Sequence, residues 1–161
     1  MEQKHLKVDT AELIEAYREL LPQVESLPLT VSGHSMSPFL ADKRDVVHLA
    51  KIKEPLKIGD IVLYQRDNGQ YILHRICKVN NDSFSIIGDA HDYIETGIRK
   101  DQIIEEVKSV ERKGKTLAPG NICWEFFSKI WIRIIPFRKN LMKLASFFYK
   151  LFRRNKNESI K

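Results

Sequence analysis

The sequence predicts a mainly β domain of the α+β class, and three features of the chain indicate this fold. Short runs rich in β-branched residues recur between turn signals from about residue 27 to residue 117. One helical pattern precedes these runs, and a basic, aromatic segment follows them. The 161 residues are 43% hydrophobic and 30% charged, a composition that suits a folded domain and excludes collagen-like, coiled-coil and wholly disordered chains.

The first expected element is an amphipathic helix from residue 10 to the mid-20s, within an N-terminal segment of residues 1–26. Asp9 and Glu12 have the spacing of a capping box. Apolar residues then recur at intervals of three and four, at Leu13, Ala16, Tyr17, Leu20 and Leu21. Pro22 is expected to disturb the end of the helix. Because the start of the chain is polar and charged, we expect neither a secretory signal nor an N-terminal membrane anchor.

The middle segment, residues 27–118, is predicted to form a small, folded-over β-domain. Its clearest strands are expected at residues 45–47, 61–64, 71–76 and 85–87. Asn68 and Gly69 form a turn signal between the second and third of these strands, which predicts an antiparallel hairpin from about residue 61 to residue 79.

The last segment, residues 119–161, differs from the rest in charge and in aromatic content. Residues 124–161 hold ten Lys or Arg and two Asp or Glu, a net charge of +8, whereas residues 1–123 carry −2. Nine of the fifteen aromatic residues also lie in this segment. We therefore place a boundary near Pro119 and Gly120.

This C-terminal segment is predicted to contain two helices divided by Pro136. In the second helix, basic and polar residues face away from an apolar set: Lys139, Lys143, Ser146, Lys150 and Arg153 against Leu141, Leu144, Ala145, Phe148 and Phe152. Cations interrupt every apolar run, which disfavours a membrane-spanning helix and favours a helix in the membrane interface. The alternative is a pair of helices packed on the β-domain or on a partner. Nucleic-acid binding is disfavoured, because the apolar content exceeds what a phosphate-binding surface needs.

The segment that indicates chemistry is residues 31–40, in which Ser35 lies on a bend after a β-prone stretch. A serine in this position can present its hydroxyl to a cleft as a nucleophile. Its own backbone N–H stays available to bind an oxyanion. A serine in a turn more often has no catalytic role, so the rest of the chain decides between the two readings.

Four blocks of sequence, in this order, resemble the S24/S26 peptidases, the group of signal peptidase I and of the LexA-like self-cleaving repressors. They are Ser-Gly-x-Ser-Met-x-Pro at residues 32–38, residues 56–62, residues 72–76 and the pair at residues 88–89. The resemblance covers about residues 27–112. It implies a LexA- or signal-peptidase-like β-domain and a serine endopeptidase with Ser35 as the nucleophile.

His74 is the candidate general base. Bacterial signal peptidases and LexA-like proteins resemble each other in having a lysine before the arginine of the third block, whereas the endoplasmic-reticulum and archaeal type has a histidine, as this chain does. A hydroxyl needs a neighbouring base, and an imidazole with a pKa near 6.5 can accept a proton at neutral pH. Activity is therefore expected to rise with pH through an apparent pKa of about 6 to 7. The alternative is a buried core histidine with no catalytic role.

The other histidines are not assigned to the site. His34 adjoins Ser35, but adjacent side chains in a bent segment usually point apart, so it is taken as a bystander. His5, His48 and His91 have no metal-ligand spacing, and Cys77 and Cys123 lie far apart. We expect no metal, no cofactor and no disulfide.

The group that orients His74 is left open between two acids. The resemblance implies an acidic residue in or after the block that begins Gly88-Asp89, where Asp89 matches directly and Glu95 lies at the later acidic position. Asp92 ranks third. Ala90 and His91 replace the asparagines that commonly follow in the family. Gly33 replaces a serine that gives some signal peptidases a second oxyanion donor, which leaves the Ser35 N–H as the expected donor.

Together these features predict a membrane-associated serine endopeptidase that cleaves a peptide or precursor protein at the cytoplasmic face of a membrane. Two alternatives remain at this point. One is a non-catalytic module that binds an extended peptide through the same cleft. The other is a LexA-like self-cleaving regulator, which the histidine at residue 74 and the short N-terminal segment disfavour.

Overall fold

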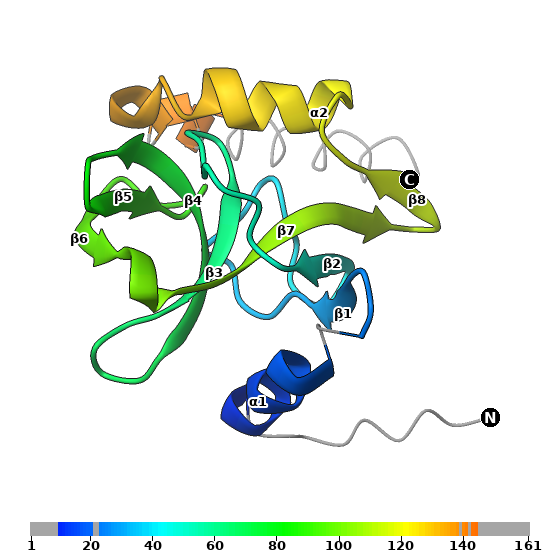
Figure 1. Cartoon of the computed structure of the whole chain (residues 1–161). Coiled ribbons are helices and arrows are strands. Elements are labelled where there is room, and N and C mark those ends of the chain that lie inside the picture. The colour runs from blue at the N-terminus through cyan, green and yellow to red at the C-terminus, as the bar shows by residue number, and fades with distance from the viewer. Residues whose placement is uncertain (1–9, 21–22, 139, 142, 145–161) are drawn as a thin grey trace.

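The fold is mainly β, as predicted, and its strands form one antiparallel eight-stranded sheet (Figure 1). The computed structural model describes residues 10–20, 23–138, 140–141 and 143–144. The strands follow the order β1-β2-β7-β3-β4-β5-β6, and β8 pairs with β7. Their bounds are β1 Leu27–Thr30, β2 Asp45–Ala50, β3 Ile61–Gln65, β4 Tyr71–Val79, β5 Ser83–Ile87, β6 Glu95–Arg99, β7 Ile103–Arg112 and β8 Lys115–Leu117.

The helical elements are the α-helices α1 Thr10–Leu20 and α2 Ile122–Glu125, the π-helix η2 Phe126–Trp131, and the 3-10 helices η1 Lys100–Gln102 and η3 Ile135–Phe137. In the view of Figure 1, α1 lies below the strands and α2 above them, while η1 lies between β6 and β7 along the chain.

The predicted hairpin is confirmed. β3 pairs with β4 in an antiparallel register that sets Val62 opposite His74 and Tyr64 opposite Ile72. Gly69 has a φ of 84° at the turn, a conformation that glycine adopts without steric cost. The other two predicted strands are parts of β2 and β5.

The N-terminal helix is confirmed over residues 10–20, but its buried face differs from the predicted one. Ile14 is almost fully buried and Tyr17 packs against the same core, while Ala16 is exposed and Leu20 is 44% exposed. The Tyr17 hydroxyl donates a hydrogen bond to the Pro28 carbonyl, so the helix is tied to the start of β1. The buried face of the helix is therefore the one that contacts the sheet, and it differs from the face that the spacing of apolar residues predicts. The capping residue expected at position 9 lies outside the described residues.

Two hydrophobic clusters form the core. One lies among α1, β1, β2, β7 and the C-terminal helical segment, and includes Trp124, Phe127 and Trp131. The other lies among β3, β4, β5 and β6, and includes Val62, Tyr64 and Ile76. His74 shares the β4 face of Ile76, because alternate residues of a strand point to the same side.

The predicted boundary near residue 119 marks a change of composition, and the chain after it continues to pack on the β-domain. Trp124, Phe127 and Trp131 are each at most 8% exposed. For this part of the C-terminal segment the packing alternative is confirmed. The π-helix η2 ends at Trp131, and after a short turn Pro136 lies within the 3-10 helix η3, so the regular helix ends before Pro136. Most of the residues predicted to form the second helix, and its predicted basic face from residue 139 to residue 153, lie outside the described residues. Within the described part of the chain, no helix combines the length and the apolar character needed to cross a bilayer.

Candidate active site

Ser35 lies in a tight turn that follows β1 and is fixed by buried apolar side chains. Met36, Phe39 and Leu40 are all buried, and the Leu40 N–H donates a hydrogen bond to the Met36 carbonyl at 2.8 Å. Gly33 enters the turn with a φ of 92° and donates its N–H to the Asp42 carboxylate at 2.8 Å. These contacts hold the backbone of Ser35 while its side chain stays partly exposed.

The base of this turn is held by a second set of contacts, centred on the buried carboxylate of Asp45 in β2. Asp45 accepts hydrogen bonds from Arg44, the shorter at 2.7 Å, and from Arg112, the shorter at 2.8 Å. It also accepts one from the Ala41 N–H at 2.9 Å. Arg112 also donates to the Phe39 carbonyl. Burial alone would raise the pKa of Asp45, but these donors outweigh it and hold the pKa well below the ordinary range.

Ser35 and His74 meet beside Gly88. A Cβ atom at Gly88 would lie 2.6 Å from the Ser35 carbonyl oxygen and 3.0 Å from His74 Nε2, so both groups border the same point. The Ala90 N–H donates to the Ser35 carbonyl at 2.9 Å and joins the two loops directly. Only glycine leaves room at this position. The Ser35 backbone, from the turn after β1, and the His74 imidazole, from β4, thus both lie next to Gly88.

No hydrogen bond joins the Ser35 hydroxyl to His74 among the described residues, and the Ser35 backbone N–H has no acceptor there either. Catalytic hydrogen bonds are often long or unformed in structures without substrate. The free N–H is available to a carbonyl oxygen of a bound substrate, which is the role expected for it.

Glu95 is the acid that reaches His74. Its Oε1 lies 3.5 Å from His74 Nδ1, on the side of the ring opposite Nε2. Arg66 fixes this carboxylate from the other direction by donating from Nε at 2.8 Å and from Nη2 at 2.5 Å. A proton on Nδ1 can therefore point to Glu95, which leaves Nε2 to accept a proton from Ser35.

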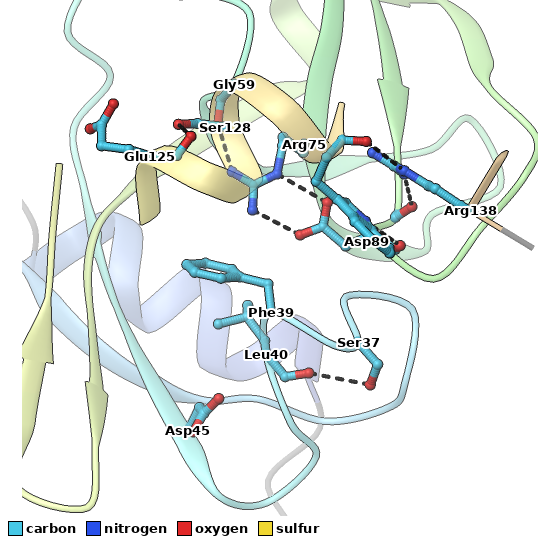
Figure 2. A network of polar contacts seen from close by, with 12 residues as sticks. Ser37, Phe39, Leu40, Asp45, Gly59, Arg75, Asp89, Glu125, Ser128 and Arg138 are labelled. Atoms are coloured by element: carbon cyan, nitrogen blue, oxygen red, sulfur yellow. Dashed lines mark hydrogen bonds and ion pairs between the residues drawn. The ribbon is translucent and has the colours of Figure 1, made fainter. Parts of the chain in front are cut away.

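Asp89 does not orient His74, which corrects the direct match in the sequence. Its carboxylate is fully buried and accepts two hydrogen bonds from Arg75, at 3.0 and 2.8 Å. Arg75 also donates to the Gly59 carbonyl at 2.9 Å, and its guanidinium lies 5.0 Å from the centre of the Phe39 ring. Figure 2 shows this pair between the loops of Gly59 and Phe39. The function of the Asp89 pair is to hold loops together.

The other two residues considered in the sequence analysis, His34 and Asp92, are both exposed. His34 is exposed on the turn of Ser35, in keeping with its treatment as a bystander. Asp92 is exposed and acts on His91, whose pKa it tends to raise.

Three residues near His74 were missed by the sequence analysis: Tyr64, Arg66 and His91. The Tyr64 hydroxyl lies 3.4 Å from His74 Nδ1, and the hairpin register could have found it, because Tyr64 follows the partner of His74 by two residues on the same face. Arg66 comes just after β3 and reaches Glu95 across 29 residues of sequence, a pairing that no local pattern indicates.

His91 packs at right angles to His74, with ring centres 5.2 Å apart, and stacks on Tyr93 with ring centres 4.6 Å apart. Its buried Nδ1 has no hydrogen-bond partner among the described residues and would lie 2.9 Å from a Cβ at Gly88. His91 therefore borders the same point as Ser35 and His74. In the sequence, only its closeness to the Gly88-Asp89 block indicated that His91 could lie near the site.

The surroundings keep His74 neutral. Burial lowers the pKa of His74 to about 4, and the nearby His91 and Arg66 act in the same direction, while Glu95 opposes them. Burial also opposes ionisation of Glu95, but the hydrogen bonds from Arg66 and Tyr64 outweigh it and lower the pKa of that carboxyl. The site therefore contains an uncharged base beside a charged acid at neutral pH.

Among the described residues, no group of three or more His, Cys, Asp or Glu side chains is placed to hold a metal ion. Cys77 and Cys123 are both free thiols.

Comparison of the chain with protein-family models gives no match, and a search of curated proteins finds no similar sequence.

Proposed function

We propose that this protein is a serine endopeptidase in which Ser35 is the nucleophile, His74 the general base and Glu95 the group that orients the base. The observation that carries the proposal is the meeting of the Ser35 backbone and His74 Nε2 beside Gly88, with Glu95 at the opposite nitrogen of the ring. The resemblance of the four sequence blocks to the S24/S26 peptidases supports the same assignment. The class of substrate that we propose is a peptide or precursor protein.

The reaction would run through an acyl-enzyme. Ser35 Oγ attacks the peptide carbonyl carbon while its proton passes to His74 Nε2, and the resulting oxyanion binds the Ser35 N–H. The C–N bond then breaks as His74 returns the proton to the leaving amine. Water, activated by the same imidazole, attacks the ester and releases the acid. Glu95 stabilises the imidazolium in both halves of the reaction.

A fluorophosphonate probe tests this proposal without knowledge of the substrate. The probe should form a covalent phosphonyl ester at Ser35, identified by peptide mass spectrometry. A non-catalytic peptide-binding module would leave the probe unreacted, and a self-cleaving regulator would show cleavage of its own chain. Absence of labelling in folded protein would contradict the proposal.

The rate of this labelling should depend on pH in a way that reports His74. Because burial lowers the pKa of His74 to about 4, the base stays neutral well below pH 6, and the labelling rate should be nearly flat from pH 6 to pH 8. The rate should fall only as the pH drops toward 4. This expectation replaces the apparent pKa of about 6 to 7 that an ordinary imidazole predicts.

Stability must be followed in the same experiment. The unfolded chain binds a proton at the ordinary histidine pKa of 6.5, while the folded chain does not bind it until about pH 4. The stability therefore decreases as the pH falls between these values. Circular dichroism at each pH separates unfolding from protonation of the base. A labelling rate that halves near pH 6.5 in fully folded protein would contradict the site described above.

We also propose that the protein associates with an anionic membrane surface through its C-terminal segment. Large apolar side chains on this segment are exposed, with Ile122 at 88%, Ile130 at 52% and Phe137 at 64%. The net charge of +8 over residues 124–161 complements an anionic bilayer. The cytoplasmic face, where anionic lipids gather, is the surface that this charge fits.

Vesicle binding by a point variant tests this association, because deleting residues 124–161 would also remove the core side chains of Trp124, Phe127 and Trp131. The double variant Ile130→Ser and Phe137→Ser should bind phosphatidylserine vesicles at least about tenfold more weakly than the wild type, since it loses apolar area. Val79→Ser, at a side chain 42% exposed on β4, is the matched control. Equal cosedimentation of all three proteins would contradict the proposal.

A further inference from the structure

The end of the described C-terminal segment reaches the turn that carries Gly88. Trp131 Nε1 donates to the Asp89 carbonyl at 2.9 Å, and Arg138 Nη1 donates to the Gly88 carbonyl at 3.2 Å. Arg138 Nε also donates to the Trp131 carbonyl at 2.9 Å, so the two anchors are joined to each other. Figure 2 shows Arg138 approaching the same network as Asp89 from the side opposite Arg75.

Arg138 is an unusual residue to bury for packing alone. It is 1% exposed, its guanidinium lies 5.3 Å from the centre of the Trp131 ring, and burial lowers its pKa. A buried cation costs free energy unless it is hydrogen-bonded, and an apolar side chain of similar volume often stabilises a core as well. What an apolar side chain could not provide is the pair of hydrogen bonds that Arg138 donates to the carbonyls of Trp131 and Gly88.

The hydrogen bond to the Gly88 carbonyl matters because Gly88 lies next to both the Ser35 backbone and His74. The Gly88 position borders the Ser35 carbonyl and His74 Nε2. Two residues later, the Ala90 N–H donates a hydrogen bond to the Ser35 carbonyl. A shift of this turn therefore moves the Ser35 loop relative to His74. Displacements of about 1 Å can lower the rate of an enzyme by about 100-fold.

We infer that Arg138 and Trp131 are positioning residues of the peptidase site, which act through the Gly88-Asp89 turn to set the distance between Ser35 and His74. The inference rests on the proposed function. It makes the C-terminal segment a working part of the site as well as a cover for the core.

The sharpest variant is Trp131→Phe, which keeps an aromatic ring at this position and removes the Nε1 donor together with part of the buried indole volume. Trp124→Phe is the matched control, because it removes the same volume at a buried tryptophan of the same segment, which packs on Phe39 and makes no hydrogen bond to the turn in the described structure. Trp131→Phe should lower kcat for a cleaved peptide by about tenfold or more and leave KM within about twofold. Arg138→Ala should have a larger effect in the same direction, and Arg133→Ala, at an exposed side chain, should have none.

Hydrogen exchange of the Ala90 amide gives a second reading that needs no activity. In Trp131→Phe this amide should exchange about tenfold faster than in the wild type, while the amide of Val62 in the centre of the sheet keeps its protection. If the Ala90 amide exchanges faster in Trp131→Phe but the wild type cleaves no peptide, the peptidase proposal is refuted. The conclusion that Trp131 holds the turn would still stand. An unchanged Ala90 amide, an equal loss of protection at Val62, or an unchanged kcat in an active enzyme would overturn the inference.

Discussion

Replacing Ser35 with alanine is expected to abolish peptide cleavage, with a fall in kcat of about 10⁶-fold, and His74→Ala is expected to have nearly the same effect. The two side chains act as a unit, because the hydroxyl is a weak nucleophile until the imidazole takes its proton. The double variant should therefore be no less active than either single variant. Cleavage of a peptide, followed by mass spectrometry, measures all three.

Two features of the site provide controls. His34→Ala removes an exposed imidazole next to the nucleophile and should retain full activity. Ser35→Ala should unfold at nearly the wild-type temperature, because Ser35 is only partly buried and alanine fits the same turn. For His74, His74→Gln keeps more of the buried volume and guards against a cavity effect. Wild-type turnover by Ser35→Ala would refute the nucleophile.

The two acids should separate when each is replaced by its amide. Glu95→Gln is expected to lower kcat by about 1,000-fold with a small loss of stability, because it removes the charge that faces the imidazolium. Asp89→Asn should instead lower the free energy of unfolding by about 3 to 5 kcal/mol, because it leaves the buried guanidinium of Arg75 without its counter-charge. Urea unfolding and steady-state kinetics on both variants test the assignment.

Arg66 offers a check on the Glu95 variant. Arg66→Gln leaves Glu95 in place but removes the cation that lowers the pKa of both Glu95 and His74, so the base should titrate at a higher pH. The opposite result, with Asp89→Asn fully stable but inactive and Glu95→Gln fully active, would reverse the roles of the acids.

Much of the β-domain could be predicted because its signals are local. The hairpin from β3 to β4 follows from a turn at Asn68 and Gly69 between two apolar runs, and the strand period alone places His74 on a buried face. Residues of the site that belong to a continuous motif, such as Ser35, could be found in the same way. The resemblance to a peptidase family added the order of the blocks.

The parts that could not be predicted depend on pairings between distant segments. Asp89 and Glu95 have equal claims in the sequence, and only the position of Arg75 assigns Asp89 to an ion pair. The aromatic residues from residue 124 onward have the composition of a membrane-binding segment. Three of them fill the core instead, because apolar surface is buried equally well against the sheet.

Synthesis of the chain from the N-terminus places Trp131 and Arg138 long after the nucleophile and the base. Ser35 and His74 can occupy a folding β-domain before the ribosome has made the side chains that fix the Gly88-Asp89 turn. Domains often begin to fold during synthesis. A nascent chain would therefore hold Ser35 and His74 in a loose arrangement, and the proposed peptidase site would become competent only when the segment of Trp131 and Arg138 docks.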